Sequence, residues 1–199
     1  RDTLFRVLAG ALSEESQRQR IAGLLEPLYT RQGAYNELVR VLEVQLEEMP
    51  EPGARVSTYM RLGELHEREL KDAAKSLQSY ARAVELDPTD VLARRELARL
   101  AGLVGALSDR AQLLENALTR VELPEVRTEI LGELAELWDV LVGNVERAVD
   151  AYRRLIASDP ESPDTVLPAA RALERLYLVK EDHANLAVAL RLQVTFEDD

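Results

Sequence analysis

The fold is decided by residues 80–88, which read YARAVELDP, because a related stretch returns further along the chain. Residues 152–160 read YRRLIASDP, with the tyrosine and the final Asp-Pro at the same places. Four prolines, Pro52, Pro88, Pro124 and Pro160, stand 36 residues apart. A fixed period of about 20–50 residues indicates stacked supersecondary units. The sequence therefore predicts a repeat protein.

Each period predicts two amphipathic helices. In residues 54–71, apolar side chains recur at helical spacing with Arg and Glu between them. Lys71-Asp72 marks a short turn, and a second helix over 73–86 ends at Asp87-Pro88 because the residue before proline avoids the helical region. Asp90 is placed to cap the following helix. One such hairpin cannot bury its apolar face alone, so consecutive hairpins must stack.

The period predicts an all-α chain of about five helical hairpins in one domain, residues 1–199. A leftover helix over residues 2–12 and the start at Arg1 rather than Met lead us to expect a piece of a longer repeat protein. The predicted helix pairs are 15–32 with 35–49, 54–70 with 73–86, 90–104 with 108–121, 125–142 with 145–157, and 163–180 with 183–196.

These residues resemble the tetratricopeptide repeat (TPR) family. The family has Leu-Gly and then an aromatic residue in its first helix, a small residue and an aromatic in its second helix, and a terminal Asp-Pro. In one repeat the corresponding residues are Leu62-Gly63, His66, Ser76, Tyr80, Ala83 and Asp87-Pro88. In another they are Leu134-Ala135, Trp138, Ala148, Tyr152 and Asp159-Pro160. Glu26, Ala101 and Glu174 depart from the pattern. The resemblance implies a right-handed α-α superhelix, or solenoid, whose first helices line a concave groove.

Composition argues against several classes of function. The chain contains no cysteine, which excludes a disulfide framework and a zinc finger, and its formal net charge of −11 disfavours nucleic-acid binding. No apolar run is long enough to span a membrane. The two histidines, His66 and His183, are interpreted as a buried residue with a satisfied partner and a solvated turn residue. We expect no metal, no cofactor and no enzymatic activity.

The candidate partner-binding residues lie at matched positions of the first helices. They are Arg31, Arg68, Arg95, Arg99, Glu136, Asp139, Arg171 and Arg175. One hypothesis is a groove that takes a segment with an acidic part near Arg95 and Arg99 and a basic part near Glu136 and Asp139. The alternative is that these charges pair with one another across adjacent helices.

Two functions remain open from the sequence. The first is a non-catalytic scaffold that presents the groove to a partner protein or peptide. It would not grip chaperone tails, because the positions of the family's Lys/Asn clamp hold Gly23, Pro27, Met60 and Glu64. The second is a structural spacer that self-associates through apolar end helices, around Leu4, Phe5, Val7 and Leu8 at the start and Leu190, Leu192, Val194 and Phe196 at the end.

Overall fold

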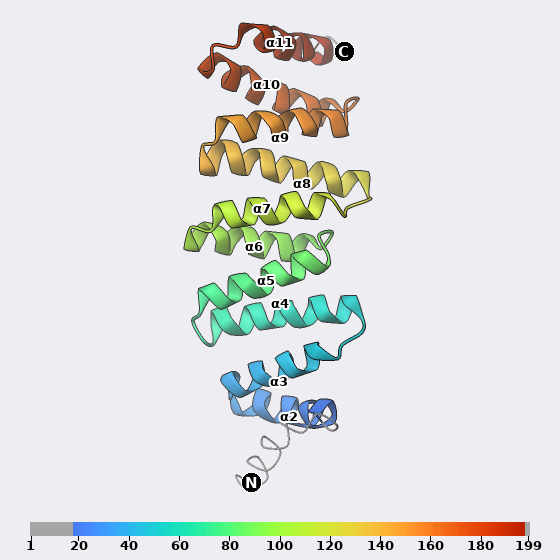
Figure 1. Ribbon diagram of the computed structural model, residues 1–199, viewed down its shortest axis with the longest axis vertical. Coiled ribbons are helices and arrows are strands. Elements are labelled where there is room, and N and C mark those ends of the chain that lie inside the picture. The colour runs from blue at the N-terminus through green and yellow to red at the C-terminus, as the bar shows by residue number, and fades with distance from the viewer. Residues whose placement is uncertain (1–17, 198–199) are drawn as a thin grey trace. The chain divides into compact units, whose positions relative to one another are not determined.

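The computed structural model describes residues 18–197, which form helices and short turns without a β-strand (Figure 1). The helix predicted over residues 2–12 lies outside the described residues. The helices are α2 (Arg18–Gln32), α3 (Tyr35–Glu47), α4 (Pro52–Arg68), α5 (Ala73–Leu86), α6 (Val91–Val104), α7 (Leu107–Leu118), α8 (Pro124–Glu136) with its π-helical continuation η2 (Leu137–Val142), α9 (Val145–Ser158), α10 (Pro163–Val179) and α11 (His183–Glu197).

The predicted all-α repeat is confirmed. Within the described residues, predicted and observed helix bounds differ by three residues at most, at the end of α7 (121 predicted, Leu118 observed). The cap predicted at Asp90 is present, because its carboxylate accepts a hydrogen bond of 3.0 Å from the Ala93 N–H. The π-helical turns of η2 were not predicted. The hand of the superhelix stays a prediction.

The chain divides into two compact units, Arg1–Gly105 and Ala106–Asp199. The core of unit 1 joins α2, α3 and α4 and includes Leu25, Leu38 and Leu42, all at most 2% exposed. The core of unit 2 joins α7, α8, η2, α9 and α10, with Leu114 and Leu134 fully buried. Each unit therefore has its own apolar core, and the single domain expected over 1–199 stays a prediction.

Every turn between paired helices contains a residue in the left-handed region. Three of the five are glycines, and the other two are Lys71 (φ 57°) and Glu181 (φ 56°). A left-handed residue just after a helix lets the next amide groups satisfy the last carbonyls. In the α4–α5 turn, the Asp72 N–H donates to the His66 carbonyl at 2.7 Å, and the Asp72 carboxylate then caps α5 through the Lys75 N–H.

The helices of the second pair approach each other most closely at Gly63. A Cβ at this position would lie 2.6 Å from Cζ of Tyr80, whose side chain is only 2% exposed. The Ser76 hydroxyl donates to the Gly63 carbonyl at 2.8 Å, so the same contact is fixed by a buried hydrogen bond. In the fourth pair, Ala135 takes the place of Gly63, and the matching Tyr152 is only partly buried.

The two glutamates that depart from the family pattern occupy this same position in the first and last pairs. Gln45 of α3 donates to the Glu26 carboxylate at 2.9 Å, and Gln193 of α11 donates to the Glu174 carboxylate at 2.8 Å. In both cases the partner follows 19 residues later, in the second helix of the pair. A side-chain hydrogen bond thus links the two helices at this position in the first and last described pairs.

Gly63→Ala is expected to destabilise the protein although alanine is the better helix former. Tyr80 is buried and must move, and overpacking of this kind costs about 1–3 kcal/mol, against a propensity gain of about 1 kcal/mol. Gly23→Ala is the control, because nothing lies within 4 Å of a Cβ there. Chemical denaturation should show a lower free energy of unfolding for Gly63→Ala and a higher one for Gly23→Ala. Equal gains would contradict the packing described here.

Lys71→Gly is expected to stabilise the protein by up to about 1 kcal/mol, because glycine adopts a positive φ without steric cost. Gln78→Gly, at an exposed position inside α5, should instead destabilise it by about 1 kcal/mol. Thermal melting of the two variants checks the turn conformation. A lower melting temperature for Lys71→Gly would be inconsistent with a left-handed residue at this position.

Candidate functional site

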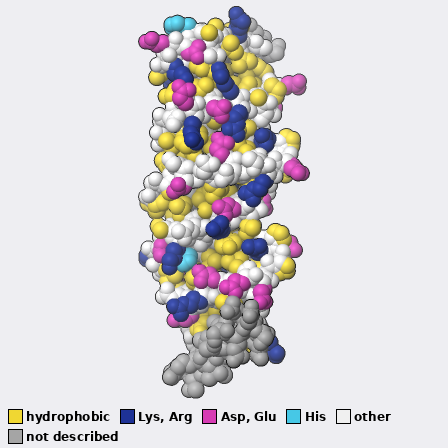
Figure 2. All heavy atoms as spheres, viewed as in Figure 1, with side chains coloured by type: hydrophobic (Ala, Val, Ile, Leu, Met, Phe, Trp, Pro, Cys, Tyr) yellow, Lys and Arg dark blue, Asp and Glu magenta, His cyan; other side chains and the backbone are white. Residues whose placement is uncertain are grey.

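The eight candidate residues lie on the first helices of the pairs, and we call them the first-helix residues. In unit 1, Arg31 and Arg68 lie in the last turns of α2 and α4, and Arg95 and Arg99 lie on α6. In unit 2, Glu136 ends α8, Asp139 lies in η2, and Arg171 and Arg175 lie on α10. Acidic and basic side chains are interspersed on the face that Figure 2 shows.

In unit 1, Arg99 is held by two carboxylates. Its Nη1 and Nη2 atoms donate to the two oxygens of Glu67 at 2.8 and 2.5 Å, and its Nε donates to Glu96 at 2.9 Å. The hydrogen bonds from Arg99 hold the pKa of the Glu67 carboxyl below its usual value, although partial burial acts in the opposite direction. A forked pair of this kind fixes both side chains.

A second ion pair in unit 1 joins the first helices of the first two repeats. Arg61 of α4 donates to the Glu26 carboxylate of α2. Burial opposes ionisation of Glu26, but hydrogen bonds from Arg61 and Gln45 outweigh it, and the pKa of this carboxyl is lowered. Glu26 therefore bonds both to its own hairpin and to the next one.

In unit 2, Asp139 is enclosed by its neighbours. Arg175 of α10 donates to the Asp139 carboxylate, and the Tyr152 hydroxyl of α9 donates to it at 3.1 Å. Only 4% of the Asp139 side chain is exposed. Burial, with the adjacent Asp139 charge, raises the pKa of Tyr152 to about 12, so the tyrosine stays a hydrogen-bond donor. The structure thus brings Asp139 and Arg175 together.

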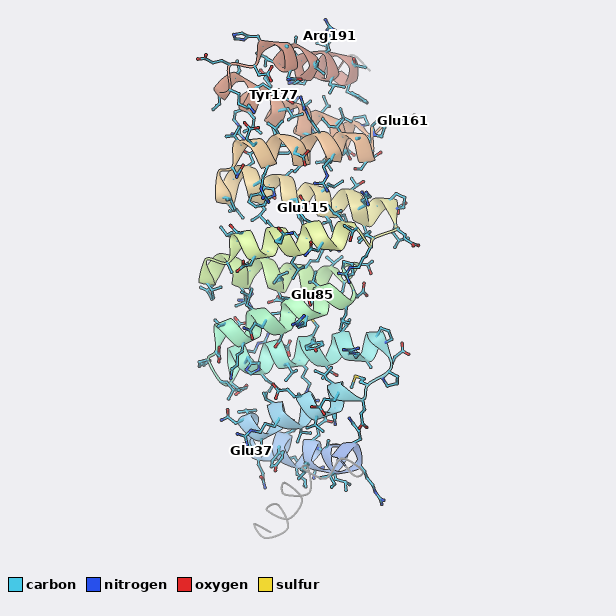
Figure 3. All side chains as sticks on the ribbon, in the orientation of Figure 1. Glu37, Glu85, Glu115, Glu161, Tyr177 and Arg191 are labelled. Carbon is cyan, nitrogen blue, oxygen red and sulfur yellow. The ribbon has the colours of Figure 1, made fainter. Side chains whose placement is uncertain are left out.

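These pairs follow the repeat period. The acid precedes the arginine by 35 residues in Glu26–Arg61, by 32 in Glu67–Arg99 and by 36 in Asp139–Arg175. Each pair therefore joins equivalent helices of successive repeats, as the alternative interpretation of the sequence expected for these charges. The second helices are linked similarly in unit 2, where Arg154 of α9 donates to both oxygens of Glu115 of α7 at 3.0 Å (Figure 3).

Other first-helix residues are exposed and stand apart from these pairs. Arg31, Arg68, Arg95 and Glu136 are exposed, and within residues 18–197 none of them forms an ion pair. Arg95 lies one helical turn before Arg99, and Arg68 directly follows Glu67. The Glu67–Arg99 pair thus places two further cations on one stretch of unit 1.

The histidines lie where the sequence predicted. His66 is buried at 5% exposure, but its Nδ1 atom has no hydrogen-bond partner among the described residues, so the expected satisfied partner is missing there. His183 begins α11 and is exposed. The described part of the chain has no cluster of potential metal ligands, and none of its helices is long and apolar enough to cross a membrane.

No family model and no curated protein matches the sequence. Among solved structures, the chain is similar to MamA, with 18% identity over 85% of this chain and 92% of that one and a TM-score of 0.48. It is also similar to MamA from Desulfovibrio magneticus RS-1, with 15% identity over 90% of this chain and 95% of that one and a TM-score of 0.46. A third similar structure is a Podosopora anserina putative kinesin light chain with nearly identical TPR-like repeats, with 18% identity over 92% of this chain and 97% of that one and a TM-score of 0.48. We take no function from these neighbours.

Arg99→Gln is expected to raise the pKa of Glu67 toward its ordinary value. Because the folded-state pKa of Glu67 is depressed, its contribution is present above the unfolded-state pKa and is lost as the pH falls through the folded-state value. The variant should lose at most about 1 kcal/mol near pH 7, as exposed ion pairs do, and less at acidic pH. NMR titration of the Glu67 carboxyl, and thermal melting of parent and variant near pH 7 and at acidic pH, test this. A Glu67 pKa that does not change would rule out the pair.

Proposed function

We propose that this chain is a non-catalytic protein-interaction scaffold whose first-helix residues in unit 1 bind an acidic segment of a partner protein. The observation that carries the proposal is the pair of exposed cations beside a fixed ion pair. Glu67 and Arg99 hold each other, whereas Arg68 and Arg95 beside them have no ion pair among the described residues. Arginine suits carboxylates because its planar fork donates two parallel hydrogen bonds.

Arg95 is the best candidate for the main contact. It lies in the second turn of α6, whereas Arg31 and Arg68 lie in the last turns of their helices. Arg99 would contribute mainly by holding its neighbours in place, since its guanidinium already donates to Glu67 and Glu96. In unit 2, Glu136 is the candidate contact for a basic part of the partner, because Asp139 is enclosed by Arg175 and Tyr152.

A second candidate function is a structural spacer that associates with another copy through its last helix. The observation that favours it is a set of exposed aliphatic side chains on α11, where Val188, Leu190 and Val194 are 53%, 42% and 59% exposed. Exposed apolar side chains on the last described repeat are what a further stacked repeat would cover. Both functions can belong to one protein.

Arg95→Glu is expected to leave stability within about 0.5 kcal/mol of the parent, since it changes an exposed residue that forms no ion pair in the described part of the chain. It should weaken binding of a fluorescent, glutamate-rich decapeptide by about tenfold or more, because an attractive charge becomes a repulsive one. Arg40→Glu, on the exposed side of α3, is the matched control for net charge. Fluorescence anisotropy at low and high salt gives both affinities.

Two results would count against the proposal. Equal weakening of peptide binding by Arg95→Glu and Arg40→Glu would show that only net charge matters. A clearly lower melting temperature for Arg95→Glu would show a structural role for Arg95. Light scattering coupled to size exclusion separates the two functions. Species that grow with concentration, and that Val194→Glu abolishes, would favour the spacer over the scaffold.

A further inference from the structure

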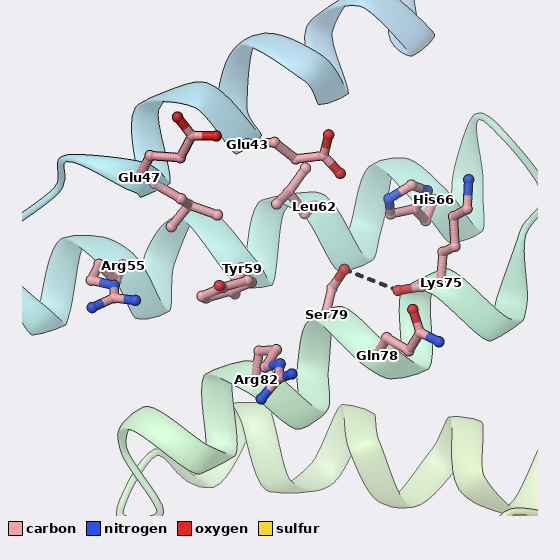
Figure 4. Close-up of a pocket in the computed structure, with 11 residues that line it drawn as sticks. Glu43, Glu47, Arg55, Tyr59, Leu62, His66, Lys75, Gln78, Ser79 and Arg82 are labelled. Atoms are coloured by element: carbon pink, nitrogen blue, oxygen red, sulfur yellow. Dashed lines mark hydrogen bonds between the residues drawn. The ribbon is translucent and has the colours of Figure 1, made fainter. Parts of the chain in front are cut away.

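A pocket of about 490 Å³ lies in unit 1 between α3, α4 and α5 (Figure 4). The α4 residues that line it, Arg55, Tyr59, Leu62 and His66, follow one another at intervals of four, three and four positions and so share one side of that helix. Glu67, which pairs with Arg99, directly follows His66 but does not line the pocket. The pocket is therefore separate from the first-helix residues.

The pocket walls carry opposite charges. Glu43 and Glu47 lie one turn apart on α3, and Arg55, Lys75 and Arg82 come from α4 and α5 (Figure 4). Two like charges one turn apart on a helix repel each other. Of the eleven lining residues only Leu46, Tyr59 and Leu62 are hydrophobic. Pockets for apolar small molecules are lined mainly by hydrophobic side chains, so this pocket suits a charged occupant.

The charged groups of the pocket are not all satisfied within the protein. Arg82 pairs with Glu85 at 2.6 Å, and Lys75 lies 3.9 Å from Asp72. In contrast, Arg55 and Glu43 form no ion pair within residues 18–197.

Two buried nitrogens of the pocket residues, Nε of Arg55 and Nδ1 of His66, also lack a hydrogen-bond partner in the described part of the chain. Burial, followed by the nearby Lys75 charge, lowers the pKa of His66, while Asp72 and Glu43 act in the opposite direction. A buried polar group without a partner costs free energy that a bound ligand can recover.

Unit 2 contains the equivalent recess, and there the protein's own residues divide it. Between α9, α10 and α11 lie two smaller pockets of about 120 and 260 Å³, and Arg153, Tyr177 and Asn185 line both. Tyr177 stands where α4 has His66, four residues after a buried leucine in each helix. Arg153 donates to the Tyr177 hydroxyl at 2.7 Å and to the Asn185 side chain at 2.8 Å. The smaller His66, and an Arg55 that forms no ion pair within residues 18–197, thus distinguish unit 1.

We infer that this pocket is a second peptide-binding site, which takes a partner segment with an acidic side chain next to a basic one. The acidic side chain accepts hydrogen bonds from the guanidinium of Arg55, and the basic side chain pairs with the Glu43 carboxylate. Tyr59, Leu46 and Leu62 contact the aliphatic stems of both. The inference does not depend on a binding role for Arg95, which lies on another helix.

Histidine NMR offers a direct test, because the chain has only two histidines. The probe is a capped hexapeptide of alternating Lys and Glu, compared with all-Glu, all-Lys and all-Gln hexapeptides. In protein labelled with ¹³C at histidine, the alternating peptide should shift the imidazole signal of His66 and leave that of His183 unchanged. His183→Gln assigns the two signals, and Arg95→Glu should bind the alternating peptide like the parent.

The variants test each charge separately. Arg55→Gln and Glu43→Gln should each weaken binding by about tenfold or more, as the loss of a charge-assisted hydrogen bond predicts. Arg55→Lys should fall between parent and Arg55→Gln, since it keeps the charge without the fork. Arg40→Gln, outside the pocket on the same helix as Glu43, should bind normally. Glu43 is exposed, so its variant keeps the test valid if Arg55→Gln unfolds.

Three outcomes would overturn the inference. The first is a His66 signal that the alternating peptide leaves unchanged at millimolar concentration. The second is an equal shift of the His66 signal by the all-Glu and alternating peptides, which would show an anion site in the pocket without a role for Glu43. The third is equal weakening by Glu43→Gln and Arg40→Gln, which would reduce the effect to net charge.

Discussion

The packing of the two helices of each hairpin at one position of the first helix is the constraint on which the rest of the structure depends. In the second hairpin Gly63 allows the ring of Tyr80 to lie against the backbone, and Ser76 bonds to the carbonyl at the same place. In the first and last hairpins a glutamate at this position bonds to a glutamine of the second helix. Both solutions fix which side of each helix faces its partner.

Once this register is fixed, the first helices place acids and arginines of successive repeats opposite each other. The resulting pairs engage some of the charged residues that the sequence offered as partner contacts, as Arg99 and Asp139 illustrate. Exposed ion pairs contribute little stability individually, but they determine which charges are left for a partner. In unit 1 these charges include the cations Arg68 and Arg95, although the whole chain is strongly acidic.

The sequence predicted the helices well because its signals are local. The Asp-Pro ends, the Asp90 cap and the turn at Lys71-Asp72 act within a few residues. The ion pairs were harder to predict, since they join residues about one repeat apart. The recurrence of an acid 32–36 residues before an arginine was nevertheless readable as a signal.

Other features depend on how whole helices pack. The π-helical turns of η2 had no recognisable sequence signal. The pocket between α3, α4 and α5 required the relative placement of three helices, although His66 at an aromatic position was a hint. The buried Nδ1 of His66 shows the same limit, because a satisfied partner was expected there and the packing leaves none.

The most direct test of this account is NMR of the arginine side chains in the unbound protein, which measures exchange and rotation at each guanidinium. The account predicts slow exchange and restricted rotation for Arg61, Arg99 and Arg175, and fast averaging for Arg68 and Arg95. Restricted rotation of Arg95 comparable to that of Arg99 would show that the protein's own carboxylates hold it. The cationic surface proposed for partner binding would then be absent.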